Sequence, residues 1–445
     1  MIDIKQIREN PEKFKAACKA KGFEVNIDLI LELDRQILAT KKKLQEIATD
    51  KNRLGKAYAR AKKEDQDQIF QQLMELKDKE QDIKIGGQIS VRWLNVELGR
   101  AESKLINIDE AIREFDELAL LVPQPADDDV PLGKDDTENV EIRREGRIRQ
   151  FDFEPKDHVQ LGLALDIIDI ERGVKLAGTR NYVLKGEGAL LHWAVLHFAM
   201  DCMVSKGYVP MSVPLLMKDK TMTGTGFFPG SEDQTYRMEK DRLNLAGTAE
   251  VPLTAYHMGE MLKAEELPLK YVALSSCFRR EAGAAGKDTY GLYRIHQFDK
   301  VEQVVICKNS IEESNKFHDE ILTNAEVVMQ ALELPYRVVN VCTGDLGRGQ
   351  AKKFDIEAWM PSRRNYCETH SASKFYEFQA RRMNLRYRDP KTKKNLFCHT
   401  LNNTVIASPR ILIPILELYQ NVDGSITVPQ VLRPYMNGKA KITSE

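Results

Sequence analysis

The stretch Phe278-Arg279-Arg280-Glu281-Ala282-Gly283 is followed, after a glycine-rich connection, by Tyr290-Gly291-Leu292-Tyr293-Arg294-Ile295-His296-Gln297-Phe298. Two alternating, partly apolar runs around such a connection predict an antiparallel hairpin with a long loop. Arg279 and Glu281 share one face of the first strand, and Phe298 and Glu302 share one face of the second. An arginine can bind a phosphate, a ring can stack on a base, and a carboxylate can accept from an amine. The hairpin is therefore a candidate nucleotide site.

Residues 278–302 resemble motif 2 of class II aminoacyl-tRNA synthetases, in the form found in seryl-tRNA synthetases. A short Phe-Arg-x-Glu run alone is more often an ordinary solvated hairpin, so the assignment depends on the rest of the chain. Residues 189–205 predict a helix that leads into a short strand ending at Pro214, which resembles motif 1, the dimer-interface segment of class II enzymes. Residues 401–410 precede an apolar helix at 411–419 and resemble motif 3, whose arginine is Arg410.

Two further stretches resemble the same family. Leu245-Ala246-Gly247-Thr248-Ala249-Glu250 puts a hydroxyl and a carboxylate two residues apart, on one face if the chain is extended, and resembles the family's Thr-x-Glu amino-acid motif. Residues 353–359 alternate as a strand, and Glu368-Thr369-His370-Ser371 follows them. The chain departs from the family where Asn403, Val405 and Pro409 replace common motif 3 glycines, which changes the local backbone but removes no charged or hydroxyl group that the chemistry needs.

The resemblance implies a role for each matching residue. Arg279 and Arg410 are the implied catalytic residues, Phe298 and Arg410 would hold the adenine between them, and Glu368 and Ser371 would bind an ATP-bound Mg²⁺. The implied ATP-binding residues are Arg279, Arg280, Glu281, Ile295, Phe298, Glu368, Thr369, His370, Ser371 and Arg410. The implied serine-binding residues are Thr248, Ala249, Glu250, Arg279, Glu302, Asn402 and Thr404.

The N-terminal quarter predicts a helical arm. Apolar residues step by three and four positions from Ile30 to Ala61, with Thr40 and Lys51 at two polar positions of this seam. Such a seam needs a partner helix, and the nearest candidate is the chain that follows it. We therefore expect an antiparallel coiled coil over about residues 28–117.

The partner helix has its own apolar pattern. It begins at Ile69 and continues past Gly86-Gly87, where we expect a kink or register shift, to Ile89, Trp93 and Val96. The arm ends at 122, and a linker rich in Pro, Gly and Asp occupies 123–136. The catalytic domain is then expected over 137–445.

Charge distinguishes the two halves of the arm. Residues 34–63 contain ten Lys or Arg against three Asp or Glu, whereas residues 64–117 contain seven against fourteen. Attraction between the two helices explains part of this asymmetry. Because the excess of positive charge lies at outward positions, we also expect RNA binding, with Lys41, Lys42, Lys43, Lys51 and Arg53 as candidate tRNA contacts.

Composition limits the remaining classes. The formal net charge of −1 argues against a general nucleic-acid-binding protein. The first residues lack a secretory signal pattern, and no long apolar run predicts a membrane span. The seven cysteines include no Cys-x-x-Cys pair, which favours reduced thiols in a cytoplasmic protein. A structural zinc held by Cys342, Cys367 and Cys398 is the less favoured alternative.

These observations predict an α+β protein in which a coiled-coil arm precedes a class II catalytic domain, built on an antiparallel sheet flanked by helices. The resemblance implies a homodimeric serine–tRNA ligase that uses ATP and Mg²⁺, forms seryl-adenylate and charges tRNASer, with selenocysteine tRNA as a further substrate left open. One alternative is a non-catalytic RNA-binding paralogue, although Arg279, Glu281 and Arg410 are all present. Another is an amino-acid:carrier-protein ligase, but those relatives lack the long basic arm.

Overall fold

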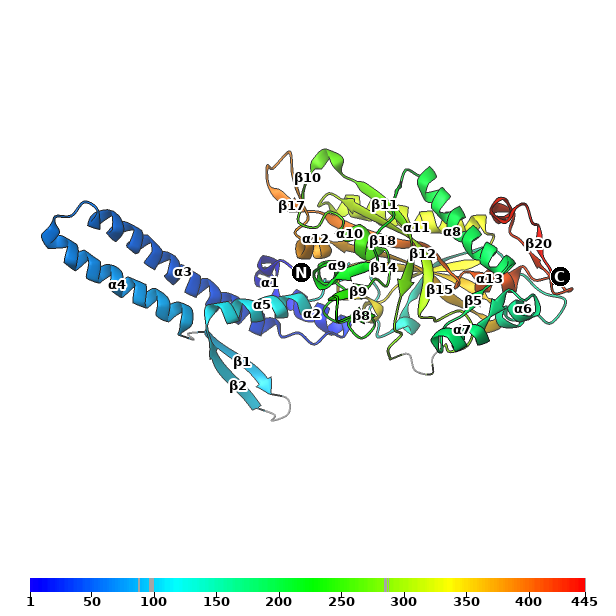
Figure 1. Cartoon of the computed structure of the whole chain (residues 1–445), viewed down its shortest axis with the longest axis horizontal. Helices are drawn as coiled ribbons and strands as arrows, with labels where there is room; N and C mark the ends of the chain where they lie inside the picture. Colours follow the sequence, from blue (N-terminus) through cyan, green and yellow to red (C-terminus); the bar gives the residue numbers. More distant parts are fainter. Residues whose placement is uncertain (87–88, 96–99, 284–285, 287, 445) are drawn as a thin grey trace. The chain divides into compact units, whose positions relative to one another are not determined.

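The structure is a computed structural model that describes residues 1–444 except 87–88, 96–99, 284–285 and 287, and only the backbone of residues 91–95 and 100–103. The chain divides into two compact units, Met1–Pro123 and Gln124–Glu445 (Figure 1). The first unit is mainly helical, and the second contains a large antiparallel sheet with helices. The expected α+β fold is therefore confirmed.

The first unit contains the expected pair of long antiparallel helices. Its helices are α1 (Ile4–Glu9), α2 (Pro11–Lys21), α3 (Ile27–Tyr58), α4 (Lys63–Ile85) and α5 (Ile108–Leu121). The seam residues Leu44, Ile47 and Leu54 of α3 are half-buried, as are Ile69, Leu73, Leu76 and Ile83 of α4. Lys51 also lies in the seam, where its ammonium binds Glu80 of α4 at 2.7 Å. The arm is therefore held by both apolar packing and a seam ion pair.

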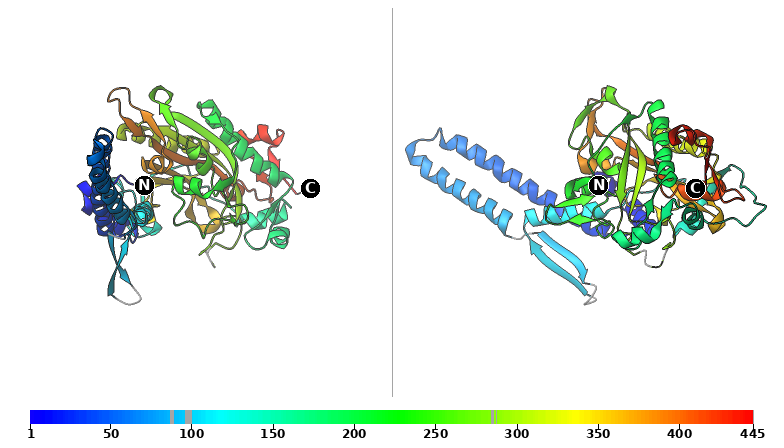
Figure 2. Two further views of the ribbon diagram at one scale, coloured as in Figure 1. Left: turned by 60° about the vertical axis from the view of Figure 1, so that its left-hand side comes forward. Right: turned by 45° about the vertical axis from the view of Figure 1, so that its right-hand side comes forward.

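The second half of the arm differs from the expectation of one kinked helix. Helix α4 ends at Ile85, and strands β1 (Ile89–Asn95) and β2 (Arg100–Ile106) form an antiparallel hairpin before α5 (Figure 2). Ile89 pairs with Ile106, and both side chains are buried with Leu33 and Ile37 of α3. Apolar and polar residues also alternate from Ile89 to Trp93, so the same sequence is compatible with a strand as well as with a helix. Gly87 and Val96 lie outside the described residues.

The expected linker is bound along the second unit. The Gln124 amide donates to the Arg348 carbonyl at 2.8 Å, and the Asp127 amide donates to the Ala351 carbonyl at 2.9 Å. The buried Lys374 ammonium binds the Asp127 carboxylate at 2.6 Å. This stretch is therefore fixed to the core rather than extended as a free tether.

An eight-stranded sheet organises the second unit. Its strand order is β3-β13-β14-β15-β18-β12-β11-β6, and neighbours run antiparallel except β11 and β6. The bounds are β3 Val140–Glu145, β13 Tyr336–Asn340, β14 Lys352–Met360, β15 Asn365–Tyr376, β18 His399–Ser408, β12 Gln297–Cys307, β11 Leu269–Phe278 and β6 Val209–Pro210. The strands of motifs 2 and 3 are thus neighbours, because β12 lies between β11 and β18.

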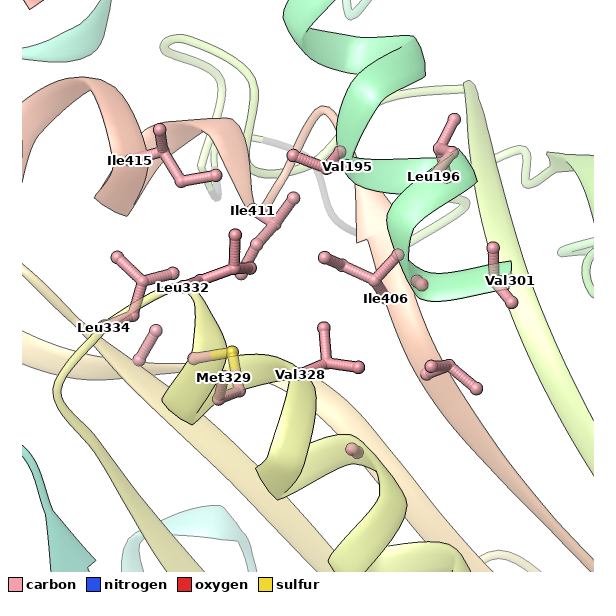
Figure 3. Packing of buried hydrophobic residues seen from close by; sticks show 14 of the residues in the cluster. Val195, Leu196, Val301, Val328, Met329, Leu332, Leu334, Ile406, Ile411 and Ile415 are labelled. Carbon is pink, nitrogen blue, oxygen red and sulfur yellow. The ribbon is translucent and has the colours of Figure 1, made fainter. Parts of the chain in front are cut away.

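Helices cover one face of this sheet and form the main core. Val195 of α8, Val328 of α11 and Ile411 before α13 pack toward Val301 and Ile406 of β12 and β18 (Figure 3). The helices of the second unit are α6 His158–Ala164, α7 Ile170–Ala177, α8 Glu187–Ser205, α9 Asp219–Thr225, α10 Glu250–Ala255, α11 Ile311–Ala331, α12 Phe378–Met383 and α13 Leu412–Leu418. Of these, α10 and α12 pack in a second cluster with Ala273 of β11 and Val304 of β12. Short strands complete the unit: β4 Ile168–Asp169, β5 Val183–Leu184, β7 Leu216–Lys218, β8 Arg237–Met238, β9 Leu243–Leu245, β10 Met261–Lys263, β16 Arg386–Arg388, β17 Asn395–Phe397, β19 Ile426–Thr427 and β20 Lys441–Ile442.

Among the described helices, only α8 is long and apolar enough to cross a membrane. Its inner face, including Leu191, Val195 and Ala199, is buried in the main core. Its buried His192 also contacts Asp299 of β12 at 3.0 Å and Ser408 of β18 at 2.8 Å. These contacts identify α8 as a core helix of this domain.

Candidate active site

A cavity of about 210 Å³ is lined mainly by residues of β12, β15, β18 and the loop between β11 and β12. Phe298 and Lys300 of β12 line the cavity. Because successive side chains of a strand point to opposite faces of the sheet, Val301 instead lies in the core beneath the helices. Its lining residues are Phe227, Thr248, Glu250, Arg279, Glu281, Leu292, Tyr293, Arg294, Ile295, Phe298, Lys300, Gln350, Glu368, Thr369, Ser371, Ser373, Asn402, Thr404, Ala407 and Arg410. Twelve of these were assigned a role from the sequence.

The central hairpin forms, but its first strand is shorter than expected. Strand β11 ends at Phe278, and Glu281 has a φ of 52°, so Arg279 and Glu281 lie in the loop after the strand and do not share one of its faces. Strands β11 and β12 are antiparallel, with Phe278 opposite Gln297. The Arg279 guanidinium lies over the Phe298 ring, 5.1 Å from its centroid, and Arg279 Nε donates to the Gly247 carbonyl at 3.4 Å. The arginine that follows β11 and the aromatic ring of β12 therefore come together, as a nucleotide site requires.

A second arginine–aromatic pair lies at the motif 3 side of the cavity. The Arg410 guanidinium lies 4.4 Å from the centroid of the Tyr293 ring, and its Nη1 donates to the Glu368 carbonyl at 3.1 Å. Arg410 lies two residues after the end of β18 and two residues before α13, so the connection between this strand and helix places it at the cavity. Nearby, Arg294 binds the Glu281 carboxylate at 2.7 Å, so that acidic group is already paired with a cation of the hairpin loop.

The other end of the cavity is rich in carboxylates and amides. Asn402 Nδ2 donates to Glu250 at 3.1 Å and to Glu302 at 2.9 Å. The Thr248 hydroxyl donates to Glu302 at 3.3 Å, and the Lys300 ammonium forms a buried ion pair with Glu302. Among the described residues, the buried Asn402 Oδ1 lacks a hydrogen-bond partner. Such an acceptor beside a carboxylate suits an ammonium or hydroxyl group of a ligand.

Thr248 and Glu250 reach this end by a turn, not by the extended conformation considered above. Ala249 is the cap residue of α10, Glu250 is the first residue of the helix, and the Glu250 amide donates to the Thr248 hydroxyl at 3.1 Å. Burial raises the pKa of Glu250 to about 7 from its usual 4.5, and the neighbouring Glu302 carboxylate adds to this rise. The carboxyl is thus poised to ionise when a cation binds beside it.

Glu368 and Ser371 of β15 both line the cavity, as a shared role at bound Mg²⁺ requires. Desolvation opposes ionisation of Glu368, but the positive charges of Arg410 and Lys353 outweigh it and lower the pKa. An ionised carboxylate and a hydroxyl are hard oxygen ligands, and Mg²⁺ commonly combines one or two carboxylates with substrate phosphates and water. The two residues therefore fit a nucleotide-bound Mg²⁺.

Four residues assigned from the sequence do not line the cavity. The Arg280 side chain is exposed, and Ala249 is buried beneath the turn that it caps. His370 is buried on β15, where its ring bonds the Thr369 hydroxyl at 2.8 Å. Glu302 is fully buried behind Lys300, Thr248 and Asn402, so its side chain acts on the cavity through those three groups.

Several lining residues were missed by the sequence analysis. Lys300 lies two residues after Phe298 and two before Glu302, and the same strand parity that was used for those residues could have identified it. Tyr293 and Arg294 lie within the quoted hairpin. Gln350, whose Nε2 donates to Ser373 at 2.7 Å, comes from a loop that carried no sequence signal.

The basic candidates of the arm have different surroundings. Lys41, Lys42 and Lys43 are exposed. Lys51 binds Glu80 within the seam, and Arg53 binds Asp50 at 3.1 Å. As for the zinc alternative, the described part of the chain contains no group of three His, Cys, Asp or Glu residues placed to hold a metal, so Cys342, Cys367 and Cys398 do not form such a site.

Comparisons with known proteins agree with this arrangement. Residues 1–111 match the family described as "Seryl-tRNA synthetase N-terminal domain", and residues 234–419 match "tRNA synthetase class II core domain (G, H, P, S and T)". The chain is 44% identical to a serine–tRNA ligase of Deinococcus radiodurans, over 99% of this chain and 98% of the relative. It is 42% identical to the serine–tRNA ligase of Thermodesulfovibrio yellowstonii, over 98% and 99%.

Solved structures show the same likeness. The seryl-tRNA synthetase of Pyrococcus horikoshii, complexed with ATP, matches all of this chain and all of its own with a TM-score of 0.88 and 36% identity. The cytoplasmic serine–tRNA ligase of Naegleria fowleri, in complex with AMP, matches with a TM-score of 0.82 and 29% identity, over 98% of this chain and 96% of its own. Family, fold and cavity agree, and the chain belongs to the seryl-tRNA synthetases, the enzymes that ligate serine to tRNA.

Proposed function

We propose that the chain activates L-serine with ATP at this cavity and then transfers the seryl group to tRNASer. The single observation that carries the proposal is the division of the cavity into two ends. Glu250, Thr248 and Asn402 lie at one end, and Arg410 and Phe298 lie at the other, with Arg279 between hairpin and serine motif. An amino acid with a positive ammonium and a negative nucleotide fit these respective ends.

The first step joins two anions. The serine carboxylate attacks the α-phosphate of ATP, a bond to the β-phosphate breaks, and pyrophosphate leaves with the electron pair. Arg279 neutralises the approaching carboxylate and α-phosphate, and Phe298 and Arg410 hold the adenine. When bound, Mg²⁺ at Glu368 and Ser371 supplies charge neutralisation for the phosphates. Because alignment and neutralisation suffice, no covalent nucleophile is needed.

Selection of serine depends on its hydroxyl. Alanine differs only by lacking that group, and an apolar pocket discriminates poorly between such similar ligands. A pocket that hydrogen-bonds the hydroxyl leaves buried polar groups unpaired when alanine binds. We assign this discrimination to Thr404, which lines the cavity, and to Glu302, which acts on the cavity through Asn402. Thr248 and Glu250 are assigned to the ammonium.

The second step requires the tRNA 3′ end beside the adenylate. A terminal ribose hydroxyl attacks the carbonyl carbon of the mixed anhydride, and AMP leaves. A neighbouring cavity of about 300 Å³ shares Phe227, Arg279, Glu281 and Arg294 with the first and is a suitable approach for that end. We assign binding of the tRNA body to the basic face of the arm, through Lys41, Lys42, Lys43 and Arg53. Lys51 is paired with Glu80 in the seam and is left out of this face.

We also propose a homodimer that works in the cytoplasm. Trp193 and Val204 of α8 and Val209 of the edge strand β6 are 54%, 44% and 54% exposed. Exposed apolar residues on a core helix and a sheet edge favour burial against a second copy, at the segment that resembles motif 1. Sedimentation at micromolar concentration tests this assignment, which a purely monomeric protein would exclude.

The decisive experiment is ATP–pyrophosphate exchange with the purified full-length chain. We expect exchange with serine, and much weaker exchange with alanine, threonine or cysteine at equal concentration. Addition of tRNASer should then yield seryl-tRNA. If serine at millimolar concentration supports no exchange while tRNA still binds, the chain is a non-catalytic RNA-binding paralogue.

A further inference from the structure

Gln379 lies behind the serine end of the cavity without lining it. It is the second residue of α12 and is 1% exposed. Its Nε2 donates to Glu250 Oε1 and to the Thr225 carbonyl, each at 2.9 Å, and its Oε1 accepts from the Thr400 hydroxyl at 2.6 Å. These partners fix the orientation of the amide, because the reversed amide would turn its oxygen toward a carboxylate and a carbonyl.

The Glu250 carboxylate receives one amide donor on each oxygen. Gln379 donates to Oε1, and Asn402 donates to Oε2 at 3.1 Å. Asn402 donates to Glu302 as well as to Glu250, whereas the hydrogen bond from Gln379 goes to Glu250 and not to Glu302. Burial and the Glu302 charge favour the protonated form of Glu250, whereas the Gln379 hydrogen bond lowers its pKa toward the ionised form.

The same helix also holds the segment that covers this end of the cavity. Thr225, the second partner of Gln379, is the last residue of α9. Arg382, one turn further along α12, donates to the Thr223 carbonyl at 3.2 Å and to the Phe228 carbonyl at 3.0 Å. Phe227, which lies between these attachment points, lines the cavity. Helix α12 therefore connects the Glu250 carboxylate with the segment carrying Phe227.

We propose that Gln379 is a positioning residue for the amino-acid substrate, which fixes the Glu250 carboxylate against the ammonium subsite and ties it to the Phe227 segment. The inference rests on the proposed assignment of Glu250 to the serine ammonium. The charged groups that act on Glu250 are Glu302 and Lys300 of β12 and Arg279 at the end of β11. From α12, by contrast, the group that acts on it is the neutral Gln379 amide.

Gln379→Leu tests the proposal, because leucine preserves most of the volume and removes both amide functions. Serine-dependent ATP–pyrophosphate exchange is measured from about pH 6 to about pH 9, with serine and ATP varied separately. At neutral pH, we expect KM for serine to rise about 10- to 100-fold, as for a lost hydrogen bond to a charged group. KM for ATP and kcat should change less than about threefold, since uniform binding of one substrate is affected. The midpoint of kcat/KM for serine should move to higher pH.

Gln303→Leu is the matched control. Gln303 is a fully buried glutamine of β12 whose Nε2 donates to the Ile321 carbonyl at 2.9 Å and whose Oε1 accepts from Asn324 at 2.9 Å, within the protein core. Its loss should lower the unfolding temperature without moving the pH midpoint for serine. Thr400→Val provides a milder test that keeps Gln379, because it removes the hydroxyl that orients the Gln379 amide.

The outcomes are separable. Exchange by the unchanged protein is required first, and its absence would remove the proposed function itself. If the unchanged protein is active and both Gln379→Leu and Thr400→Val retain its serine KM and pH midpoint, the positioning role is wrong. If Gln379→Leu does not fold, Thr400→Val decides, with a rise in serine KM and an upward midpoint supporting the role and unchanged values overturning it.

Discussion

The Arg279 guanidinium lies over the Phe298 ring, with 5.1 Å between the guanidinium carbon and the ring centroid. An adenine that stacks on this face of Phe298 has to displace the guanidinium, which is then free to contact a phosphate. Nucleotide binding should therefore exchange the cation–π contact for a base stack and a phosphate contact, so the two side chains contribute to different steps. We therefore expect Arg279 to contribute to the chemistry and Phe298 to contribute to nucleotide affinity.

Arg279→Ala should separate activation from tRNA binding. Loss of a group that neutralises charge in the transition state should lower serine-dependent exchange about 10²- to 10³-fold. Binding of tRNASer, measured by filter retention, should be nearly unchanged because the arm is intact. Arg388→Ala, which removes an arginine of β16 bonded to Asn395 away from the cavity, is the matched control. Equal loss of exchange in both variants would contradict the assigned role.

Thr404→Val should weaken discrimination between serine and alanine. Valine keeps the shape of threonine but cannot pair with the substrate hydroxyl, so kcat/KM for serine should fall about 10- to 100-fold. Alanine-dependent exchange should change little, because alanine makes no such bond. Thr343→Val is the control, since it removes a buried hydroxyl that bonds the Gly133 carbonyl outside the cavity. A parallel loss with both amino acids would assign Thr404 a general packing role.

The fold could be predicted from the sequence where a local pattern of apolar residues is compatible with only one kind of secondary structure. The hairpin, the motif 3 strand and helix, and the seam of α3 formed because alternating or heptad patterns fix which face is buried. The prediction of a continuing helix after Ile85 was wrong, because the spacing of Ile89 and Trp93 fits both a helical pattern and the period-two pattern of a strand. The choice there was made by tertiary packing, because Ile89 and Ile106 complete a cluster with Leu33 and Ile37.

The site was predicted well for residues that lie on a motif strand or within two residues of its end. Arg279, Phe298 and Arg410 all line the cavity. Contacts between distant segments left no local signal. Gln379 meets Glu250 across 129 positions of the sequence, and Lys51 meets Glu80 across 29, so neither pairing could be read from a motif.

Serine use should depend on pH through Glu250. The folded-state pKa of about 7 lies above the usual 4.5, so serine kcat/KM should rise as pH increases through neutrality and the carboxylate forms. The sign for stability is opposite. Between these two pKa values the unfolded state has released the proton and the folded state retains it, so stability falls as pH rises.

Glu250→Gln checks that sign directly, because glutamine has no proton to lose. Its free energy of unfolding relative to the unchanged protein should increase by about 3 kcal/mol between about pH 4 and about pH 8, measured by urea unfolding. Any constant offset from altered hydrogen bonding cancels in this comparison. A pH-independent difference would mean that Glu250 has the same pKa in the folded and unfolded states.

Changing Lys41, Lys42 and Lys43 together to glutamine should weaken tRNASer binding and its salt dependence. Each lost phosphate contact should reduce the slope of log affinity against log salt by about 0.7 to about 0.9. Serine-dependent exchange should be unaffected. Changing Lys77 and Lys79, exposed lysines of the acidic helix α4, provides the comparison. If that pair has as large an effect per lysine, positive charge on either helix contributes equally.

Replacement of residues 48–83 by a short turn should separate the two steps of the reaction. The pairing of Lys51 with Glu80 places these two cut points close together across the arm. The base of the arm keeps the Arg8–Asp34 ion pair and the cluster of Ile37, Ile89 and Ile106.

All residues assigned to ATP and serine lie in the second unit, so serine-dependent exchange should remain within about twofold of the intact protein. Charging of tRNASer should fall at least about tenfold, because the replaced segment includes six of the ten basic residues between 34 and 63. If this shortened protein charged tRNASer fully, the tRNA-binding surface would have to lie on the base of the arm or on the second unit.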